Sequence, residues 1–363
     1  MSYEKSNLKQ ITIIKTGKLD SNAAVPNGMY PFFTCNPTTL RINTWAYDTE
    51  AVLLAGNNAS GNYTAKYYKG QFNAYQRTYI IESADKEKLD VRYLAYAMNE
   101  ELKLLKTMSA GSTTKFLKIG MLRGLEISLP DISIQRKIAS ILGNYDNFIE
   151  NNQKQIKLLE EAAQRLYKEW FVDLHFLGYE DVEIVDGVPE GWTEGTLGDV
   201  ATFKRGKTIT KAQVHDGDVP VVAGGLEPAY YHNKANTISP VITVSGSGAN
   251  AGFARLYNVD IFASDCSFVD SDTTPYLFFV YCFIKNNKDK FNALQKGSAQ
   301  PHVYAKDINA LKILIPTNKI IEEFCDLVSQ YFEKIKILQI QIQLSTEARD
   351  RLLPKLMNGE IEV

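Results

Sequence analysis

The stretch IASILGNYDNFIENNQKQIKLLEEAAQRLYKEW, residues 138–170, decides the fold, because its seam positions recur in steps of four and three. These positions are Ile138, Leu142, Tyr145, Ile149, Asn152, Ile156, Leu159, Ala163, Leu166 and Trp170. All are apolar or aromatic except Asn152. A stripe this narrow cannot bury itself and needs a facing helix. The stretch therefore predicts one half of a coiled coil.

A second stretch, FCDLVSQYFEKIKILQIQIQLSTEARDRLLPKL at residues 324–356, has the same register. Its seam is Phe324, Val328, Tyr331, Ile335, Leu338, Ile342, Ser345, Arg349, Leu352 and Leu356. Ser345 and Arg349 are its polar exceptions. Each helix could instead pack on its own domain. We expect the two helices to pack antiparallel on each other, because both stripes are long, narrow and in register, and a buried Asn152 would then help to fix that register.

Residues near the ends of both stretches give helix boundaries. Asp131 or Ser133 is the expected cap of the first helix, and Thr317 or Asn318 that of the second. Pro354 and Gly359 predict where the second helix ends. A helix of roughly 35 residues is about 50 Å long at 1.5 Å per residue. A rod of that length could set the distance between two DNA half-sites one helical turn apart, roughly 34–36 Å.

The second half of the chain repeats the first at an offset of about 186–190 residues. Matched pairs run through the whole length: Lys15 and Lys204, Gly17 and Gly206, Lys18 and Lys207, Gly56 and Gly246, Pro130 and Pro316, Arg165 and Arg351. Each copy is a globular segment followed by a long helix. The repeat thus predicts two homologous domains related by a pseudo-twofold axis.

Within the globular segments, residues 241–245 and 276–283 are β-branched or aromatic runs that predict strands. Residues 90–106 have helical spacing. We expect an α+β fold of two homologous domains separated by two long helices that form an antiparallel coiled coil. The expected boundaries are a first domain at 1–130, a helix at 131–172, a connector at 173–199, a second domain at 200–316, a helix at 317–358 and a tail at 359–363.

Charge is distributed unevenly along a chain whose net charge is −2. Residues 1–130 carry 16 basic against 11 acidic side chains, and residues 200–318 carry 12 against 9. The connector 173–199 carries 8 acidic side chains and no lysine or arginine. Two mildly basic regions are compatible with two DNA-contacting domains, although surpluses of this size also occur on proteins that bind no nucleic acid.

Composition favours a soluble cytoplasmic protein. No apolar run approaches the roughly 20 residues that span a bilayer, and the first residues lack the apolar core of a signal peptide. The four cysteines, Cys35, Cys266, Cys282 and Cys325, form no C-x-x-C pair. We expect reduced thiols and no metal site.

Several segments resemble the specificity subunits of type I restriction-modification systems, the HsdS family. QRKIASIL at 135–142 and RLYKEWFVD at 165–173 are similar to the central region of that family. GVPEGW at 187–192, LGDV at 197–200 and KRGK at 204–207 resemble the entry into its second target recognition domain. RLLPKLMNGEI at 351–361 resembles its distal region. The resemblance extends over essentially the whole chain.

The resemblance implies a non-catalytic protein that reads double-stranded DNA. Each target recognition domain would read one half of a bipartite asymmetric target, and the coiled coil would set the unread spacer. The implied partners are two methyltransferase (M) subunits and restriction (R) subunits. S-adenosylmethionine, ATP and Mg²⁺ would be bound by those partners, which would carry out methylation, translocation and cleavage. No cofactor is expected in this chain.

One stretch is a near miss to a nucleotide-binding loop. ATFKRGKT at 201–208 has alanine where the phosphate-binding pattern requires glycine, and the sister copy lacks the hydroxyl that would hold magnesium. A Gly-Lys turn that brings an ammonium group near a DNA phosphate fits both copies better. The expected phosphate contacts are Lys15, Lys18, Lys66, Lys69, Lys204, Arg205 and Lys207.

Two pairs of polar loops are candidates for base reading. GNNASG at 56–61 matches SGSGANAG at 245–252, and GSTTKF at 111–116 matches GSAQPHV at 297–303. Glycine allows close approach to a ligand, and polar side chains can bond base edges. The expected base readers are Asn57, Asn58, Thr114, Lys115, Ser247, Asn250, Gln300 and His302.

Three alternatives remain open at this stage. The chain could serve another restriction-modification class with different enzymes attached. It could be a coiled-coil scaffold without DNA readout, which predicts no sequence-selective DNA protection. It could be a standalone enzyme, although the chain has neither an Asn-Pro-Pro-Tyr-like tetrapeptide nor a G-x-G-x-x-G after a strand.

Overall fold

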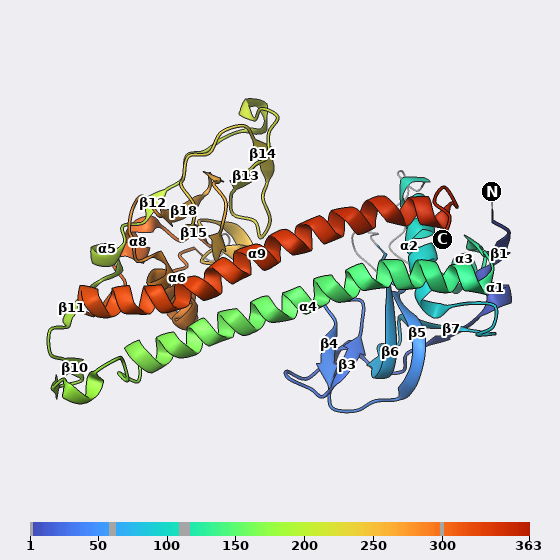
Figure 1. The fold of residues 1–363 in the computed structure, drawn as a ribbon, viewed down its shortest axis with the longest axis horizontal. Helices are drawn as coiled ribbons and strands as arrows, with labels where there is room; N and C mark the ends of the chain where they lie inside the picture. The colour runs from blue at the N-terminus through green and yellow to red at the C-terminus, as the bar shows by residue number, and fades with distance from the viewer. Residues whose placement is uncertain (1–2, 58–62, 109–116, 298–300) are drawn as a thin grey trace. The chain divides into compact units, whose positions relative to one another are not determined.

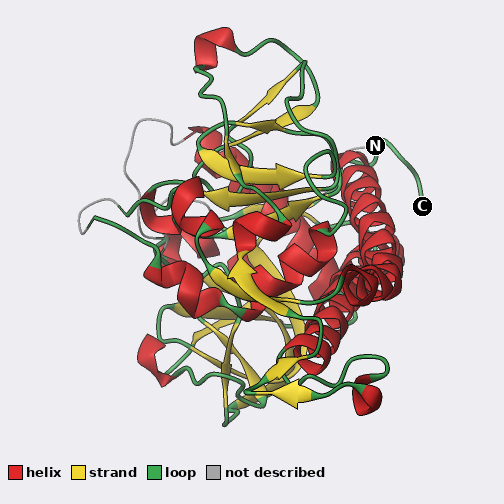
Figure 2. Cartoon of the chain, turned by 90° about the vertical axis from the view of Figure 1, so that its left-hand side faces the viewer, coloured by secondary structure: helices red, strands yellow, loops and turns green. Residues whose placement is uncertain are grey.

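The computed structural model describes residues 3–57, 63–108, 117–297 and 301–363 (Figure 1). Contacts divide the chain into two compact units. Unit 1 consists of residues 1–151 and 341–363, and unit 2 of residues 152–340. The two long helices, α4 (Ile132–Phe171) and α9 (Asn318–Met357), are 40 residues each. Each unit therefore contains one half of each helix, and both units combine strands with helices (Figure 2).

Unit 1 is built on a six-stranded sheet with the order β2-β7-β5-β6-β3-β4. Its strands are β2 (Thr12–Thr16), β3 (Tyr30–Phe33), β4 (Leu40–Ile42), β5 (Tyr47–Ala55), β6 (Ala65–Ala74) and β7 (Thr78–Ser83). A separate antiparallel pair joins β1 (Lys5–Asn7) to β8 (Glu126–Ser128). The helical elements are α1 (Leu8–Ile11), η1 (Ser21–Ala23), α2 (Val91–Met108) and α3 (Ile119–Arg123).

The central strand β5 explains why both faces of this sheet are covered. Successive side chains of a strand face opposite sides. Val52 and Leu54 pack in the core that contains α2, while Ala51 and Leu53 belong to a second cluster on the other side. All four are at most 2% exposed. This agrees with the nearly continuous apolar run that the sequence shows here.

Unit 2 repeats this order of elements with a split sheet. One sheet has the order β12-β18-β15-β16 and another the order β14-β13-β17. In unit 1 the single strand β6 pairs with both β5 and β3. In unit 2 these two pairings are made by separate strands, because the chain bends at Asn258 and Val259: β16 pairs with β15, and β17 pairs with β13.

The bounds of the unit 2 elements follow the repeat. The strands are β9 (Ile184–Val185), β10 (Val188–Pro189), β11 (Thr193–Thr196), β12 (Lys204–Arg205), β13 (Val219–Val222), β14 (Tyr230–His232), β15 (Val241–Ser245), β16 (Ala254–Tyr257), β17 (Phe262–Ala263), β18 (Cys266–Asp270) and β19 (Lys312–Ile315). The helical elements are η2 (Tyr179–Asp181), α5 (Leu197–Val200), η3 (Lys211–Gln213), η4 (Gly248–Asn250), α6 (Leu277–Asn286), α7 (Lys288–Ala293) and α8 (Ala305–Asn309).

Two sequence predictions are confirmed: the strand at 241–245 is β15, and the helix at 90–106 is α2. The strand predicted at 276–283 is wrong, because this run forms most of α6. Seven of the ten α6 residues are buried. A helix that is buried on nearly all sides has a continuous apolar sequence, and periodicity cannot distinguish such a helix from a buried strand.

In both units α4 and α9 pack on each other. In unit 1, Ile138 and Leu142 near the start of α4 share a core with Leu353 and Leu356 near the end of α9. In unit 2 the ring of Phe324, near the start of α9, lies 4.9–6.0 Å from rings near the end of α4. Opposite ends of the two helices therefore meet within each unit. This arrangement makes the pair antiparallel, as the sequence predicts.

Each helix also packs on a globular domain, so the two packing modes considered from the sequence occur together. In unit 1 the Arg92 guanidinium of α2 donates to the carbonyl of Gly143 in α4 at 3.0 Å. In unit 2 the ring of Phe332 in α9 stacks on Phe278 of α6 with centroids 4.5 Å apart. The buried face is consequently wider than a two-residue seam, and it includes Tyr167 at 3% exposure.

None of the predicted seam residues is exposed in the structure. Ile138, Leu142, Ile149, Asn152, Phe324, Val328, Ile335 and Leu338 are buried, while Tyr145, Ile156, Leu159, Leu166, Tyr331, Ile342 and Leu352 are partly buried. The polar exception Arg349 donates from Nη1 to Oδ1 of Asp146 in α4 at 2.8 Å. A charge in this stripe is thus neutralised by the facing helix.

The two long helices start at the predicted caps, and α9 ends just before Gly359. The carbonyl of Asp131 accepts the first backbone bonds of α4, and that of Thr317 those of α9. Pro354 lies in the last turn of α9, which ends at Met357, against the expected bound of 358. Pro354 has no N–H to donate to the carbonyl of Asp350, while its neighbours Leu353 and Leu356 remain in the core of unit 1. Gly359, with φ of 76°, follows the helix end as predicted.

Candidate DNA interface

A set of backbone hydrogen bonds in unit 2 ties the start of the domain to two loops. Gly206 N–H donates to the carbonyl of Cys266 at 2.8 Å, and Gly246 N–H donates to that of Asp265 at 3.3 Å. Val303 N–H in turn donates to the carbonyl of Gly246 at 3.1 Å. The loop after β15, the chain before β18 and the segment around 302 therefore meet at one place.

Unit 1 contains the same bonds between repeat-related residues. Gly17 N–H donates to the carbonyl of Thr78 at 3.0 Å, and Gly56 N–H donates to that of Arg77 at 2.8 Å. Leu117 N–H donates to the carbonyl of Gly56 at 2.9 Å. We call this set of three bonds, in either unit, the loop frame. In unit 2 it joins the two polar loops that the sequence predicts to read bases, and in unit 1 it joins Gly56 to Leu117.

A glycine at the start of each loop frame is required by close backbone contact. A Cβ atom on Gly206 would lie 2.2 Å from the carbonyl oxygen of Ser264, and one on Gly17 would lie 2.2 Å from that of Ala74. No side chain fits at such distances. The Gly-Lys turn is therefore a packing feature first. In unit 2 the residues before it form strand β12, which pairs with β18 and does not lead into a phosphate-binding helix.

Three side chains converge at the loop frame of unit 2. Asp265 accepts a hydrogen bond from Ser247 Oγ on Oδ2 at 2.5 Å, and it pairs through Oδ1 with Nη2 of Arg205 at 3.3 Å. The Arg205 side chain is 62% exposed. Its neighbour Lys204 reaches Thr273 instead, with Nζ 3.4 Å from Oγ1, because adjacent residues of a strand face opposite sides.

The loop frame of unit 1 has other side chains at the same places. The repeat aligns Thr16 with Arg205, Asn57 with Ser247, and Arg77 with Asp265. Thr16 and Arg77 are exposed and Asn57 is partly buried. The backbone is thus reproduced while the polar groups that it presents differ in charge and length.

The lysines that follow the frame glycines are exposed in both units. Lys18 N–H donates to Ala74 at 3.2 Å and Lys207 N–H to Ala263 at 2.9 Å, which fixes their backbones while their side chains lie in solvent. Lys15 pairs with Glu82 at 2.6 Å and still leaves half of its side chain exposed. These positions suit contact with phosphate, and their predicted role stays a prediction.

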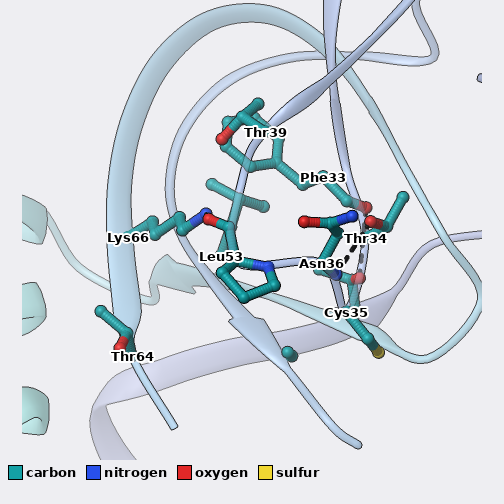
Figure 3. A pocket seen from close by; sticks show the side chains of 11 residues that line it. Phe33, Thr34, Cys35, Asn36, Thr39, Leu53, Thr64 and Lys66 are labelled. Carbon is teal, nitrogen blue, oxygen red and sulfur yellow. Dashed lines mark hydrogen bonds between the residues drawn. The ribbon is translucent and has the colours of Figure 1, made fainter. Parts of the chain in front are cut away.

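Lys66 lines a pocket of about 400 Å³ beside the loop that follows β3, with Asn36 on another wall (Figure 3). The pocket adjoins the loop frame of unit 1, because Thr78 also lines it. Its ammonium group donates to the carbonyl of Pro37. Burial lowers the pKa of Lys66. Lys69, three residues along β6, is exposed.

The remaining predicted base readers are distributed as follows. Asn58, Thr114, Lys115 and Gln300 lie outside the described residues. The backbone of His302 pairs with Lys296, and its ring lies 6.0 Å from that of Tyr304. Asn250 accepts a bond from Phe253 N–H through its carbonyl at 2.9 Å. Ser247, Asn57 and His302 are the predicted readers that the loop frames bring together with Arg205 or its counterpart.

Sequence reasoning missed Thr16, Arg77 and Asp265. Asp265 is 60 positions from Arg205, and no motif links the two residues. Thr16 and Arg77 differ from their counterparts in type, so a search for matching letters passes over them. The flanking matches align Thr16 with Arg205, whereas only the shared backbone bonds align Arg77 with Asp265.

Comparison with known families decides what kind of domain the two units contain. Residues 2–161 and 189–347 each match the family model of the type I restriction modification DNA specificity domain. The chain belongs to this family. The two matched specificity domains correspond to the two copies of the internal repeat, so the repeat inferred from the sequence is confirmed.

Individual relatives share the same description. The chain is 29% identical over 284 residues to the type I restriction enzyme MjaIX specificity subunit of Methanocaldococcus jannaschii, which covers 71% of this chain and 66% of that protein. It is 35% identical over 165 residues to the EcoDI specificity subunit of Escherichia coli, which covers 46% and 36%. The chain thus aligns with just under two thirds of the first relative and about a third of the second.

Two further comparisons span nearly the full length of both chains. A putative type I specificity subunit of Mycoplasma genitalium is 23% identical over 371 residues, covering 98% of this chain and 94% of that protein. The crystal structure of a type I restriction-modification system S subunit from M. genitalium matches with a TM-score of 0.64 at 18% identity, covering 98% and 96%. At that identity the likeness shows a common fold. None of the helices in the described part of the chain is long and apolar enough to cross a membrane.

Proposed function

We propose that this chain is the DNA sequence-specificity subunit of a type I restriction-modification complex. Each specificity domain would read one half of a bipartite asymmetric target. One observation carries the proposal: the two domains build the same loop frame from backbone bonds and present different polar side chains on it. Two recognition domains that read different half-sites would share a backbone scaffold and differ in the side chains that contact the bases.

In this proposal the chain positions other subunits and performs no chemistry itself. Methyltransferase subunits, two in number, would dock on it and transfer methyl groups from S-adenosylmethionine to adenine. Restriction subunits would add ATP- and Mg²⁺-dependent translocation and cleavage. The relatives' descriptions as specificity subunits support this division of labour. The complex would act on chromosomal and incoming DNA in the cytoplasm.

The helix pair would set the spacer between the half-sites. Removing residues 150–156 and 336–342 deletes one heptad from each helix at repeat-related places and returns each seam to nearly the same face. Seven residues correspond to about 10 Å of helix, or roughly three base pairs of 3.4 Å. We expect a methylated target with a shortened spacer and unchanged half-site bases. Changed half-site bases with an unchanged spacer would contradict this division of roles.

The experiment that tests the whole proposal is a map of methylated adenines in the host genome, with and without this gene. The expected result is one bipartite motif that disappears with the gene and returns with a plasmid copy. An identical methylation map in both strains would overturn the proposal. Co-purification then identifies the class, because a type I complex brings down both a methyltransferase and an ATP-driven motor.

A further inference from the structure

We propose that Arg205, held by Asp265 beside Ser247, reads a guanine edge in the half-site of the second domain, and that Arg77 is the corresponding reader of the first domain. This inference rests on the proposed function and extends it to individual residues. It assigns Arg205 to a base, whereas the sequence pattern places it among the phosphate contacts.

The first argument comes from which cations the two domains have in common. Lys15 and Lys204 occupy equivalent positions, and so do Lys18 and Lys207. The phosphate backbone is the same in both half-sites, so a group that contacts it can be the same in both domains. These repeated lysines therefore suit phosphate contacts.

The second argument is that the residues that differ are those at the loop frame. Arg205 is replaced by Thr16, and the acid Asp265 by the base Arg77. The frame bond itself is unchanged, because it uses the backbone carbonyl of Asp265 or Arg77. A change in side-chain charge at a fixed backbone position alters which base edge is recognised without altering the scaffold.

The third argument is the geometry of the Arg205 side chain. Asp265 contacts it at one terminal nitrogen, Nη2, at a distance of 3.3 Å. Over the described residues, no other partner of the guanidinium lies within bonding distance, and the side chain is 62% exposed. The remaining donors form the fork that matches O6 and N7 of guanine. Asp265, whose other oxygen accepts from Ser247, acts as a positioning residue for that fork.

The test uses the full chain in its complex with its own modification subunits, and its readout is the methylation motif. Arg205→Ala should make one base pair of one half-site degenerate, with discrimination there falling about 5- to 150-fold, as expected for the loss of a bidentate base contact. Asp265→Asn should weaken reading at the same base pair. Arg77→Ala should make a base pair degenerate in the other half-site only.

Lys204→Ala is the matched control, because it removes a neighbouring cation from the opposite face of the same strand. We expect a weaker overall affinity, a shallower salt dependence and an unchanged motif. If Arg205→Ala behaves like Lys204→Ala, Arg205 contacts phosphate and the inference is wrong. If Arg205→Ala, Asp265→Asn and Arg77→Ala all leave a sharp wild-type motif, the inference is also overturned, although the proposed function stands. A complex that yields no motif with the unaltered chain refutes the proposed function instead.

A structural defect is recognised separately. The amount of assembled complex and its melting temperature are measured for every variant. If Arg205→Ala does not assemble, the near-isosteric Asp265→Asn and the exposed-site variant Arg77→Ala decide the question. The inference requires that their effects fall in different half-sites.

Discussion

Phe324→Ala removes the aromatic ring at the centre of the helix pair in unit 2. The ring of Phe324 is fully buried, and its centroid lies 4.9 Å from that of Phe171, 5.9 Å from Trp170 and 6.0 Å from Tyr167, all in α4. It also lies 6.3 Å from Phe279 of α6. One side chain of α9 therefore connects α4 to the globular part of the unit.

The expected loss of stability follows from this burial. Truncation of a buried phenylalanine to alanine costs about 3–5 kcal/mol, because the transfer free energy of the ring is lost and a cavity remains. For a unit the size of residues 152–340, each kcal/mol lowers the melting temperature by about 2–4 °C. We expect the transition of unit 2 to fall by about 6–20 °C.

The measurement is thermal and urea unfolding of the full chain, with hydrogen exchange to assign each transition to a unit. Phe148→Ala is the control, because it makes the same chemical change on α4 at a side chain that is 43% exposed. Its cost should stay below about 1 kcal/mol. Equal effects of the two substitutions would refute the packing argument, as would a loss below 1 kcal/mol for Phe324→Ala.

Three other perturbations test separate parts of the structure. A double-mutant cycle of Asp146→Asn and Arg349→Gln should give a coupling free energy of about 1 kcal/mol, because water still reaches both side chains, which are a third exposed or less. A coupling of zero would contradict a role of this pair in helix pairing. Gly206→Ala should lower the melting temperature of unit 2, because the added Cβ meets backbone at 2.2 Å, and an unchanged transition would show that the turn is not close-packed. Iodoacetamide should modify Cys35 before Cys266, because burial raises the pKa of Cys266 to about 12; peptide mapping that finds the reverse order would refute the described burial.

The helix pair was predictable because its signal is long and local. A stripe repeated over some 30 residues specifies helix, register and partner together, and the polar position Asn152 lies in the buried stripe with its apolar neighbours. Arg349 shows where the pattern is insufficient. Its place in the stripe is visible in the sequence, but the neutralising Asp146 lies 203 positions away and is off the seam.

Short apolar runs were less predictable, and α6 illustrates the reason. Aromatic and β-branched residues are enriched in strands, yet Phe279 and Val280 are fully buried in a helix. Packing against α4 and α9 decides the conformation, and this packing involves residues far away along the chain. Packing also holds the last turn of α9 in place: Pro354 cannot bond the carbonyl of Asp350, but Leu353 and Leu356 on either side remain in the core of unit 1.

The candidate interface was only half accessible from sequence. Matching letters locate what the copies share, which includes the frame glycines and the lysines after them. A search for identical residues does not single out the positions at which the two copies differ. Asp265 and Arg77 become comparable only when the carbonyls that accept from Gly246 and Gly56 are superimposed as parts of one hydrogen-bond pattern.

The separation of scaffold from reader has a physical cause. The loop frame is held by backbone donors and acceptors and by glycines in close contact, so its geometry depends little on the side chains that it presents. In the proposed role, exchange of a side chain there would change recognition at small cost to folding. If the frame contacts DNA as proposed, the exchange is constrained in pairs, because Asp265 without Arg205 would leave an uncompensated carboxylate facing a negatively charged ligand. In the first domain Thr16 and Arg77 occupy the two positions of that pair, so no carboxylate remains there without a basic partner.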